Sequence, residues 1–343
     1  MALEAYLEKT KYPLELAKSR PFRRAVIILV SFSFIVVFVF STIGFEDVEE
    51  YFLPTINYPP RVPSCVSQNI TGQQDIWEEA QQKFLHLPED KFTIVMQTYQ
   101  RPKELNTTLE TLLGEEIPSL HEVVIVWNDI EAKPPANFKS KHGVAVRFRV
   151  SKRNSLNEKL WPDPDYRTQA VLLSDDDVYY RPKDLEFVFQ SWRKFGHNRL
   201  TGALARCSSV DKHGSFNYNF CSNRRNQDVY QMILTNLCFS HLSYLDYYSS
   251  NDTTMEAIRK YVDDGFNCED IALNYVQSLL TGHGPLLVNG HDKYANLDPS
   301  KGISNKQGHM QARSKCLNDF AAMFECMPLV DETAHVQKGV IVM

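Results

Sequence analysis

The chain has 343 residues, of which 43% are hydrophobic and 12% aromatic, and its formal net charge is −5. Enough apolar side chains are present to bury a core, so the composition indicates a globular protein and excludes a disordered one. The near balance of charge gives no general attraction to nucleic acid, and we expect no nucleic-acid partner.

Residues 25–45, AVIILVSFSFIVVFVFSTIGF, contain no charged side chain. A helix needs about 20 such residues to cross the roughly 30 Å hydrocarbon core of a bilayer. Six Lys and Arg residues lie within residues 1–24, and four Asp and Glu residues lie within residues 46–50. Because basic flanks stay in the cytosol, we predict a cytosolic tail (1–24), a transmembrane signal anchor and a lumenal remainder, which is single-pass type II topology. The alternative is a cleaved signal peptide, but the apolar run is long for one and has no evident small-residue cleavage site.

A lumenal location makes two further patterns informative. Three triplets, which begin at Asn69, Asn106 and Asn251, fit the N-glycosylation pattern. The seven cysteines include no CxxC pair, which argues against a structural zinc site and permits disulfides in an oxidising lumen. Their odd number leaves at least one thiol unpaired or bonded to another chain. Cys65 is a candidate for such a link in a homodimer, although nothing in the sequence selects it.

The apolar pattern after the anchor predicts one α/β domain. Residues 46–90 are interpreted as a lumenal stem that ends in a short helix at 75–87. The folded domain is expected over residues 91–330, with a C-terminal tail at 331–343. Strand, helix and strand in short succession favour a sheet with right-handed crossovers. The expected elements of the domain are strands at 92–99, 121–129, 144–150 and 167–177 and a helix at 101–115.

Three adjacent carboxylates, Asp175, Asp176 and Asp177, follow the apolar run at residues 170–173. Ligands of open α/β sheets gather at the carboxyl ends of strands, and side-chain alternation would place Asp175 and Asp177 on one side. Two facing carboxylates are costly unless a cation lies between them, so the triplet predicts Mn²⁺ or Mg²⁺ held against the phosphates of a nucleotide. The alternative interpretation is a solvated acidic turn.

Five segments in chain order give the triplet a context. As a set they resemble the exostosin-like N-acetylhexosaminyltransferases, glycosyltransferase family 64, over about residues 91–329. The resemblance implies a GT-A-type fold, which is a Rossmann-like mixed sheet flanked by helices. It also implies a UDP-sugar donor, Mn²⁺ and retention of the α configuration of the sugar. The segments are QTYQR (97–101), VVIVWND (123–129), NSLNEK (154–159), LLSDDD (172–177) and NCEDIALNY (267–275).

The resemblance also implies a role for each matching residue. Asp177 is the implied direct metal ligand, and Asp175 is a candidate contact to the sugar. Asp270 matches the carboxylate near the reacting carbon and Arg313 a basic residue near the diphosphate, so both are candidate catalytic residues. The implied donor-binding residues are Gln97, Thr98, Tyr99, Arg101, Asn128, Asn154, Lys159, Asp175 and Asp176.

Two further implications concern Lys159 and a disulfide. Lys159 stands where the family often has Arg, and it lacks the planar fork for bidentate phosphate binding. Cys268 and Cys316 match a family disulfide that would join the Asp270 helix to the Arg313 segment.

Acceptor selectivity is expected to depend on residues 202–228, where Arg224 and Arg225 lie, and on residues 281–307.

These patterns favour a retaining N-acetylhexosaminyltransferase (GlcNAc or GalNAc) of the Golgi, or the endoplasmic reticulum, acting on a glycan or glycolipid. One alternative is a family member that uses another hexose donor on a glycosyl inositol lipid. A nucleotidyltransferase is disfavoured because the loop at 97–101 has no glycine and the anchor points to the lumen. A non-catalytic glycan-binding protein is disfavoured because the acidic triplet, Asp270 and Arg313 are all present.

Overall fold

The computed structural model describes residues 58–65, 73–136, 138–221, 229–292, 294–297 and 307–339. Its folded unit begins at Tyr58. The predicted anchor, residues 46–57 and 66–72 of the predicted stem, and the Arg224–Arg225 pair lie outside the described residues. Among the helices that are described, none combines the length and the apolar character needed to cross a bilayer.

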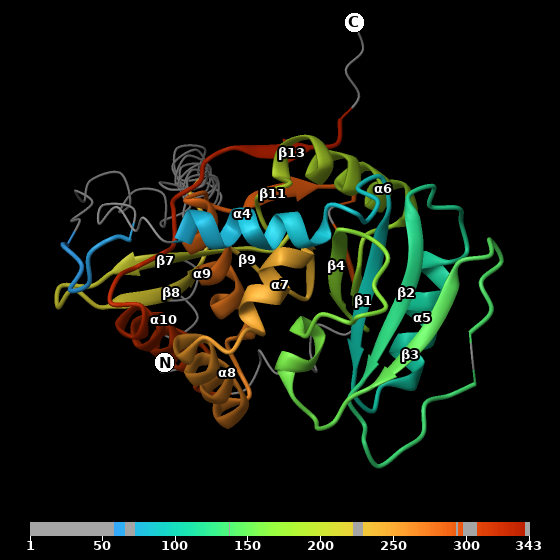
Figure 1. Ribbon diagram of the computed structural model, residues 1–343, viewed down its shortest axis with the longest axis horizontal. Coiled ribbons are helices and arrows are strands. Elements are labelled where there is room, and N and C mark those ends of the chain that lie inside the picture. Colours follow the sequence, from blue (N-terminus) through green and yellow to red (C-terminus); the bar gives the residue numbers. More distant parts are fainter. Residues whose placement is uncertain are drawn as a thin grey trace, which may run out of the picture. The chain divides into compact units, whose positions relative to one another are not determined.

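A mixed eight-stranded sheet forms the centre of the unit, in the order β13-β11-β6-β10-β4-β1-β2-β3 (Figure 1). The four strands expected from the sequence are present as β1, β2, β3 and β4, and they pair in parallel. The antiparallel strand β10 lies between β4 and β6. The bounds are β1 Phe92–Thr98, β2 Leu120–Trp127, β3 Ala145–Val150, β4 Ala170–Asp175, β6 Thr201–Gly202, β10 Leu237–His241, β11 Leu286–Asn289 and β13 His335–Gln337.

Helices cover both faces of this sheet because its central strands are apolar on both sides. All seven residues of β1 are buried, and Val95 faces one buried cluster while Ile94 and Met96 face another. The helices α5 (Pro102–Leu112) and α6 (Pro182–Ser191) pack into the cluster of Ile94. The helices α7 (Leu242–Tyr248), α8 (Thr253–Gly265), α9 (Glu269–Thr281) and α10 (His309–Met323) pack into the cluster of Val95.

The ends of the folded unit differ from the predicted stem and tail. Helix α4 (Gln73–Phe84), which we assigned to the stem, packs on α7 and α9 (Figure 1). Lys83 of this helix forms an ion pair of 2.5 Å with Asp246. At the other end, β13 pairs with β11, so residues 335–337 belong to the sheet. The sequence predicted a helix at 75–87 but assigned it to the stem, and it missed β13, in which only Val336 is partly buried.

The predicted acceptor region is built around a β-hairpin. Strand β7 (Ala205–Val210) pairs with β8 (Phe216–Phe220) and with β9 (Met232–Ile233). Helix α10 holds this hairpin, since the backbone N–H groups of Phe216 and Tyr218 donate to side chains of the helix. The remaining elements of the described residues are β5 (Val178–Tyr179), β12 (Ala295–Asn296), the 3-10 helix Leu156–Leu160 and a π-helical turn Trp192–Gly196.

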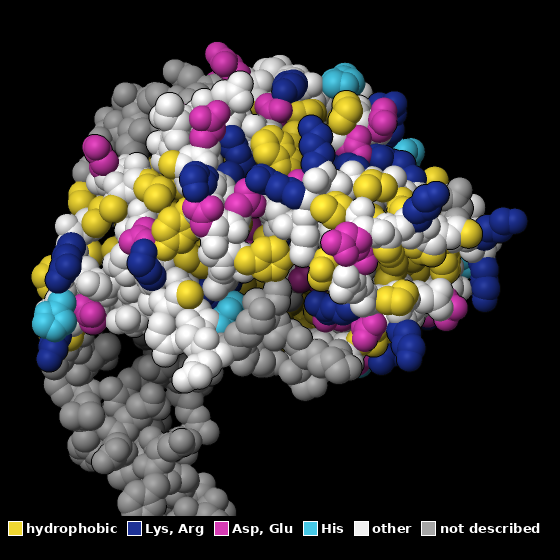
Figure 2. Space-filling view, turned by 90° about the horizontal axis from the view of Figure 1, so that it is seen from below, with side chains coloured by type: hydrophobic (Ala, Val, Ile, Leu, Met, Phe, Trp, Pro, Cys, Tyr) yellow, Lys and Arg dark blue, Asp and Glu magenta, His cyan; other side chains and the backbone are white. Residues whose placement is uncertain are grey.

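Six of the seven cysteines form disulfides within the chain. The implied pair Cys268–Cys316 is present, and Cys207–Cys221 and Cys65–Cys326 are two further disulfides. Cys238 is a buried free thiol. The alternative that Cys65 links two chains is therefore wrong, because the C-terminal segment brings Cys326 to it. On the face shown in Figure 2, acidic and basic side chains are interspersed.

Candidate active site

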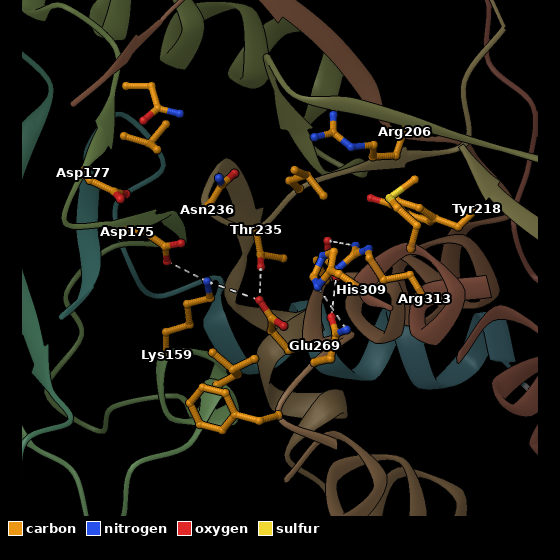
Figure 3. Close-up of a pocket in the computed structure, with 18 of the residues that line it drawn as sticks. Lys159, Asp175, Asp177, Arg206, Tyr218, Thr235, Asn236, Glu269, His309 and Arg313 are labelled. Atoms are coloured by element: carbon orange, nitrogen blue, oxygen red, sulfur yellow. Dashed lines mark hydrogen bonds and ion pairs between the residues drawn. The ribbon is translucent and has the colours of Figure 1, made fainter. Parts of the chain in front are cut away.

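A cavity of about 210 Å³, here called the first cavity, opens at the carboxyl ends of β1 and β4. Figure 3 shows Asp175, Asp177 and Lys159 on one side of it and Tyr218 and Arg313 on the other. We call these sides the DDD wall and the α9–α10 wall. The cavity is lined by six residues that the sequence had singled out: Arg101, Lys159, Asp175, Asp177, Asp270 and Arg313.

The side chains of the acidic triplet point alternately to opposite sides at the end of β4. Asp175 and Asp177 line the first cavity, whereas Asp176 is buried beneath it. The Thr98 hydroxyl donates to the Asp176 carboxylate at 2.6 Å, and the Thr108 hydroxyl donates to the Asp176 carbonyl at 2.7 Å. The expected placement of Asp175 and Asp177 on one side is thus confirmed, and Asp176 fixes the turn between them.

Each cavity-lining carboxylate of the DDD wall has a cationic partner. Arg101 forms ion pairs with Asp177 and, at 3.3 Å, with Asp176. Lys159 lies 2.9 Å from the Asp175 carboxylate and 3.6 Å from Glu269, and only 1% of its side chain is exposed. Burial alone would lower the pKa of Lys159, but the charges of these two carboxylates raise it above the usual value. Lys159 is therefore a fixed positive charge within the site.

Burial opposes the ionisation of two carboxylates of the triplet, Asp176 and Asp177. It raises the pKa of Asp176 to about 7, against the opposing effect of the Thr98 hydrogen bond. Burial also raises the pKa of Asp177, and the adjacent charge of Asp175 raises it further. A cation placed between Asp175 and Asp177 would reverse this effect.

The donor set of this wall suits a hard divalent cation. No three His, Cys, Asp or Glu side chains converge as a metal site in the part of the chain that the structure describes. Mg²⁺ is, however, commonly held by one or two carboxylates together with substrate phosphates. Asp177 and Asp175 supply such oxygens, so the residues fit Mn²⁺ or Mg²⁺ that a diphosphate helps to bind.

The α9–α10 wall is assembled from two helices that are distant in sequence. The Asp270 carboxylate at the start of α9 forms an ion pair with the Arg313 guanidinium on α10, and both side chains are buried. Arg313 also donates to the Asn267 side chain at 3.2 Å and stacks 4.3 Å above the Tyr218 ring. Burial would lower the pKa of Arg313, but the charge of Asp270 raises it. The disulfide between Cys268 and Cys316 joins the same two helices.

The other predicted donor contacts gather beside the first cavity and do not line it. The side-chain amides of Gln97 and Asn128 both donate to the Ser155 carbonyl, at 2.7 and 2.8 Å. Asn128 also donates to the exposed Asn154 side chain at 3.4 Å. Tyr99 is 44% exposed. The structure therefore groups Gln97, Asn128 and Asn154, and their donor-binding roles stay predictions.

Several buried polar atoms around the cavity have no partner among the described residues. They include Gln97 Oε1, Asn236 Oδ1 and Arg313 Nε. Two of these residues, Asn236 and Arg313, line the first cavity. Because a buried polar atom without a hydrogen bond is costly, a polar ligand in the cavity would be favoured if it bonded to the atoms of Asn236 and Arg313.

Sequence analysis missed part of the lining. Glu269 lines the cavity, contacts Lys159 and accepts a hydrogen bond of 3.4 Å from Thr235. Arg206 and Tyr218 also line it, from the hairpin β7–β8. The alternation of Phe216, Tyr218 and Phe220 is a period of two and could have identified a strand there.

Comparison with known proteins identifies the family of the chain. Residues 92–340 match the Glycosyl transferase family 64 domain, so the chain belongs to this glycosyltransferase family. It is 30% identical to Exostosin-like 2 of Homo sapiens over 254 residues, which covers 70% of this chain and 74% of that protein.

Two relatives in Arabidopsis thaliana have names that specify a sugar and a lipid. Glucosamine inositolphosphorylceramide transferase 1 is 33% identical over 240 residues, which is 68% of this chain and 30% of that protein. Glycosylinositol phosphorylceramide mannosyl transferase 1 is 29% identical over 257 residues, which is 70% of this chain and 74% of that protein.

Proposed function

We propose that the chain is a retaining, metal-dependent transferase of GT-A type that moves an N-acetylhexosamine from a UDP-sugar to a glycan or glycolipid. The observation that carries the proposal is the first cavity itself, which has carboxylates for a metal–diphosphate on one wall and a buried carboxylate–guanidinium pair on the other. The predicted anchor supports a lumenal site in the Golgi or endoplasmic reticulum.

The DDD wall supplies what the leaving nucleotide requires. When bound by Asp177, with Asp175 beside it, a divalent cation would neutralise the diphosphate and stabilise the charge that develops on the leaving UDP. Arg101 and Lys159 add positive charge to the same wall. Arg101 is 36% exposed in its side chain, so its guanidinium can exchange a carboxylate partner for a phosphate oxygen.

The α9–α10 wall suits the sugar. A glycosyl transition state resembles an oxocarbenium ion, and a nearby carboxylate stabilises its positive charge. Asp270 offers that carboxylate, and its ion pair with Arg313 holds it at the wall of the cavity. The unpartnered Arg313 Nε is a further donor for a phosphate or sugar oxygen.

A second candidate differs in the sugar and the acceptor. The Arabidopsis relatives are named for glucosamine transfer and mannosyl transfer to inositol phosphorylceramides. These names support an inositol phospholipid acceptor as well as a glycan, and a hexose as well as a hexosamine donor. The donor panel in the assay below distinguishes between these two candidates.

The test is nucleotide release by the full chain in detergent, with a panel of UDP-hexosamines, UDP-hexoses and GDP-mannose, in Mn²⁺ or in chelator. We expect release from one donor, with at least a 100-fold loss in chelator and in Asp177→Ala, because leaving-group stabilisation is removed. Asp165→Asn removes an exposed carboxylate outside the first cavity and should retain full activity. Release from no donor, together with no UDP binding by calorimetry, would refute the proposal.

A further inference from the structure

Helix α5 presents one face to the turn that carries the acidic triplet. Arg101, at the N-cap of this helix, and Thr108 are seven positions apart, which is about two helical turns, so their side chains lie on the same face. Arg101 forms ion pairs with Asp176 and Asp177. The Thr108 hydroxyl donates to the Asp176 carbonyl at 2.7 Å. The helix therefore contacts the turn through one charged group and one neutral group.

The hydroxyl of Thr108 does not make the bond that is usual for a threonine within a helix. The Thr111 hydroxyl of the same helix donates to the Thr107 carbonyl, four positions earlier, at 2.8 Å. The Thr108 hydroxyl is fully buried and bonds instead to a carbonyl that is 68 positions away in the sequence. Because a buried hydroxyl is costly without a partner, Thr108 and the Asp176 carbonyl satisfy one another.

The two contacts of α5 respond differently to an incoming diphosphate. The Arg101 side chain is 36% exposed, and its guanidinium can leave a carboxylate for a phosphate oxygen. Thr108 is uncharged and inaccessible, so a phosphate neither attracts it nor reaches it. The hydrogen bond from Thr108 therefore continues to hold the turn when Arg101 changes its partner.

The carbonyl that Thr108 binds determines where Asp177 lies. It belongs to the planar peptide group that joins Asp176 to Asp177, so fixing its direction also fixes the position of the Asp177 backbone. A second buried hydroxyl holds the turn from its other end, since Ser174 donates to the Val178 carbonyl at 3.1 Å. The backbone around Asp177 is thus held on two sides by neutral groups that lie outside the first cavity.

We propose that Thr108 is a positioning residue of the metal site, whose hydroxyl holds the Asp176–Asp177 peptide group so that the Asp177 carboxylate faces the first cavity. The inference rests on the proposed function, because it concerns the cation that Asp177 would bind there. Thr108 is also the third residue of the triplet at Asn106 that fits the N-glycosylation pattern. A test must therefore separate the effect of the hydroxyl from that of a glycan.

The binding of Mn²⁺ tests the inference without requiring turnover. The full chain in detergent is titrated with Mn²⁺ in the presence of UDP, and the free ion is measured by its electron paramagnetic resonance signal. Thr108→Ser and Thr108→Ala both remove the methyl group and differ only in the hydroxyl. We expect the serine variant to bind Mn²⁺ as the unaltered chain does. The alanine variant should bind it about tenfold more weakly, which corresponds to about 1.4 kcal/mol.

Controls separate the hydroxyl from other effects of the substitutions. Every variant also carries Asn106→Gln, so none of them can be glycosylated at that position. Thr107→Ala removes an exposed hydroxyl one position away and should leave Mn²⁺ binding unchanged. If Thr108→Ala does not fold, as judged by urea unfolding, Thr108→Val takes its place because it keeps the volume of the side chain. Equal Mn²⁺ binding with and without the hydroxyl at position 108 would overturn the proposal.

Turnover distinguishes this inference from the function on which it rests. In Thr108→Ala, we expect the Mn²⁺ concentration for half-maximal nucleotide release to rise about tenfold, while release at saturating Mn²⁺ stays within about twofold of the unaltered chain. A loss of release that saturating Mn²⁺ does not restore would indicate a general structural role and refute positioning of the metal ligand. Absence of Mn²⁺ binding by the unaltered chain with UDP would overturn the metal-dependent function, and the inference with it.

Discussion

The two walls of the first cavity are built in different ways. The DDD wall takes its carboxylates from three consecutive residues at the end of one strand. The α9–α10 wall joins Asp270 to Arg313, which are 43 positions apart, through an ion pair and a nearby disulfide. A local strand end thus fixes the first wall, whereas the second depends on two helices remaining together.

The largest effect is expected when the buried pair of the α9–α10 wall is broken. Arg313→Met leaves the Asp270 carboxylate buried without a partner, which costs about 3–5 kcal/mol, and removes a donor near the leaving group. We expect nucleotide release to fall at least about 1,000-fold, measured beside unfolding by urea. Arg313→Lys keeps the positive charge. It should therefore retain more of the folding stability than of the nucleotide-release activity. Full activity in Arg313→Met would exclude a catalytic role for this pair.

The next effect is expected at the buried lysine of the DDD wall. Lys159→Met leaves Asp175 and Glu269 close together without their shared cation, whereas Lys159→Arg keeps the charge. We expect the Met variant to lose about 100-fold in nucleotide release and about 3 kcal/mol in the free energy of unfolding. Lys315→Met removes an exposed lysine and should leave both quantities unchanged. If Lys159→Met and Lys315→Met had the same nucleotide release and the same free energy of unfolding, Lys159 would have no role in the site beyond that of an exposed lysine.

The smallest effect on nucleotide release, though not on folding stability, is expected from removing the two disulfides near the cavity. Replacing Cys268 and Cys316 by alanine opens a loop of sequence separation 48, and the chain-entropy relation predicts a loss of about 4 kcal/mol. The same change at Cys207 and Cys221, with separation 14, should cost about 3 kcal/mol. Donor hydrolysis should fall in the first variant and persist in the second. If donor hydrolysis instead persisted without the Cys268–Cys316 disulfide and fell without the Cys207–Cys221 disulfide, the helices α9 and α10 would not be the part of the site on which hydrolysis depends.

This contrast also explains how far the sequence was informative. The strands β1 and β4 and the triplet were predictable because apolar runs and adjacent acids are local patterns. Asp270, Arg313 and their disulfide were reached only through a family resemblance, since no spacing rule joins positions so far apart. Arg206 was missed because an arginine on a short hairpin has no local signal, and its place in the cavity lining comes from the strand pairing that forms the hairpin. The stem boundary differed because α4 is held to the unit by tertiary packing.

The disulfide between Cys65 and Cys326 has a consequence for biosynthesis. Its two cysteines are separated by 261 positions, so Cys65 leaves the ribosome roughly 10–50 s before its partner at usual elongation rates. During that interval Cys65 is an open thiol at the beginning of the folded unit. A chain that ends before Cys326 cannot form this disulfide and keeps the Cys65 thiol free of that partner.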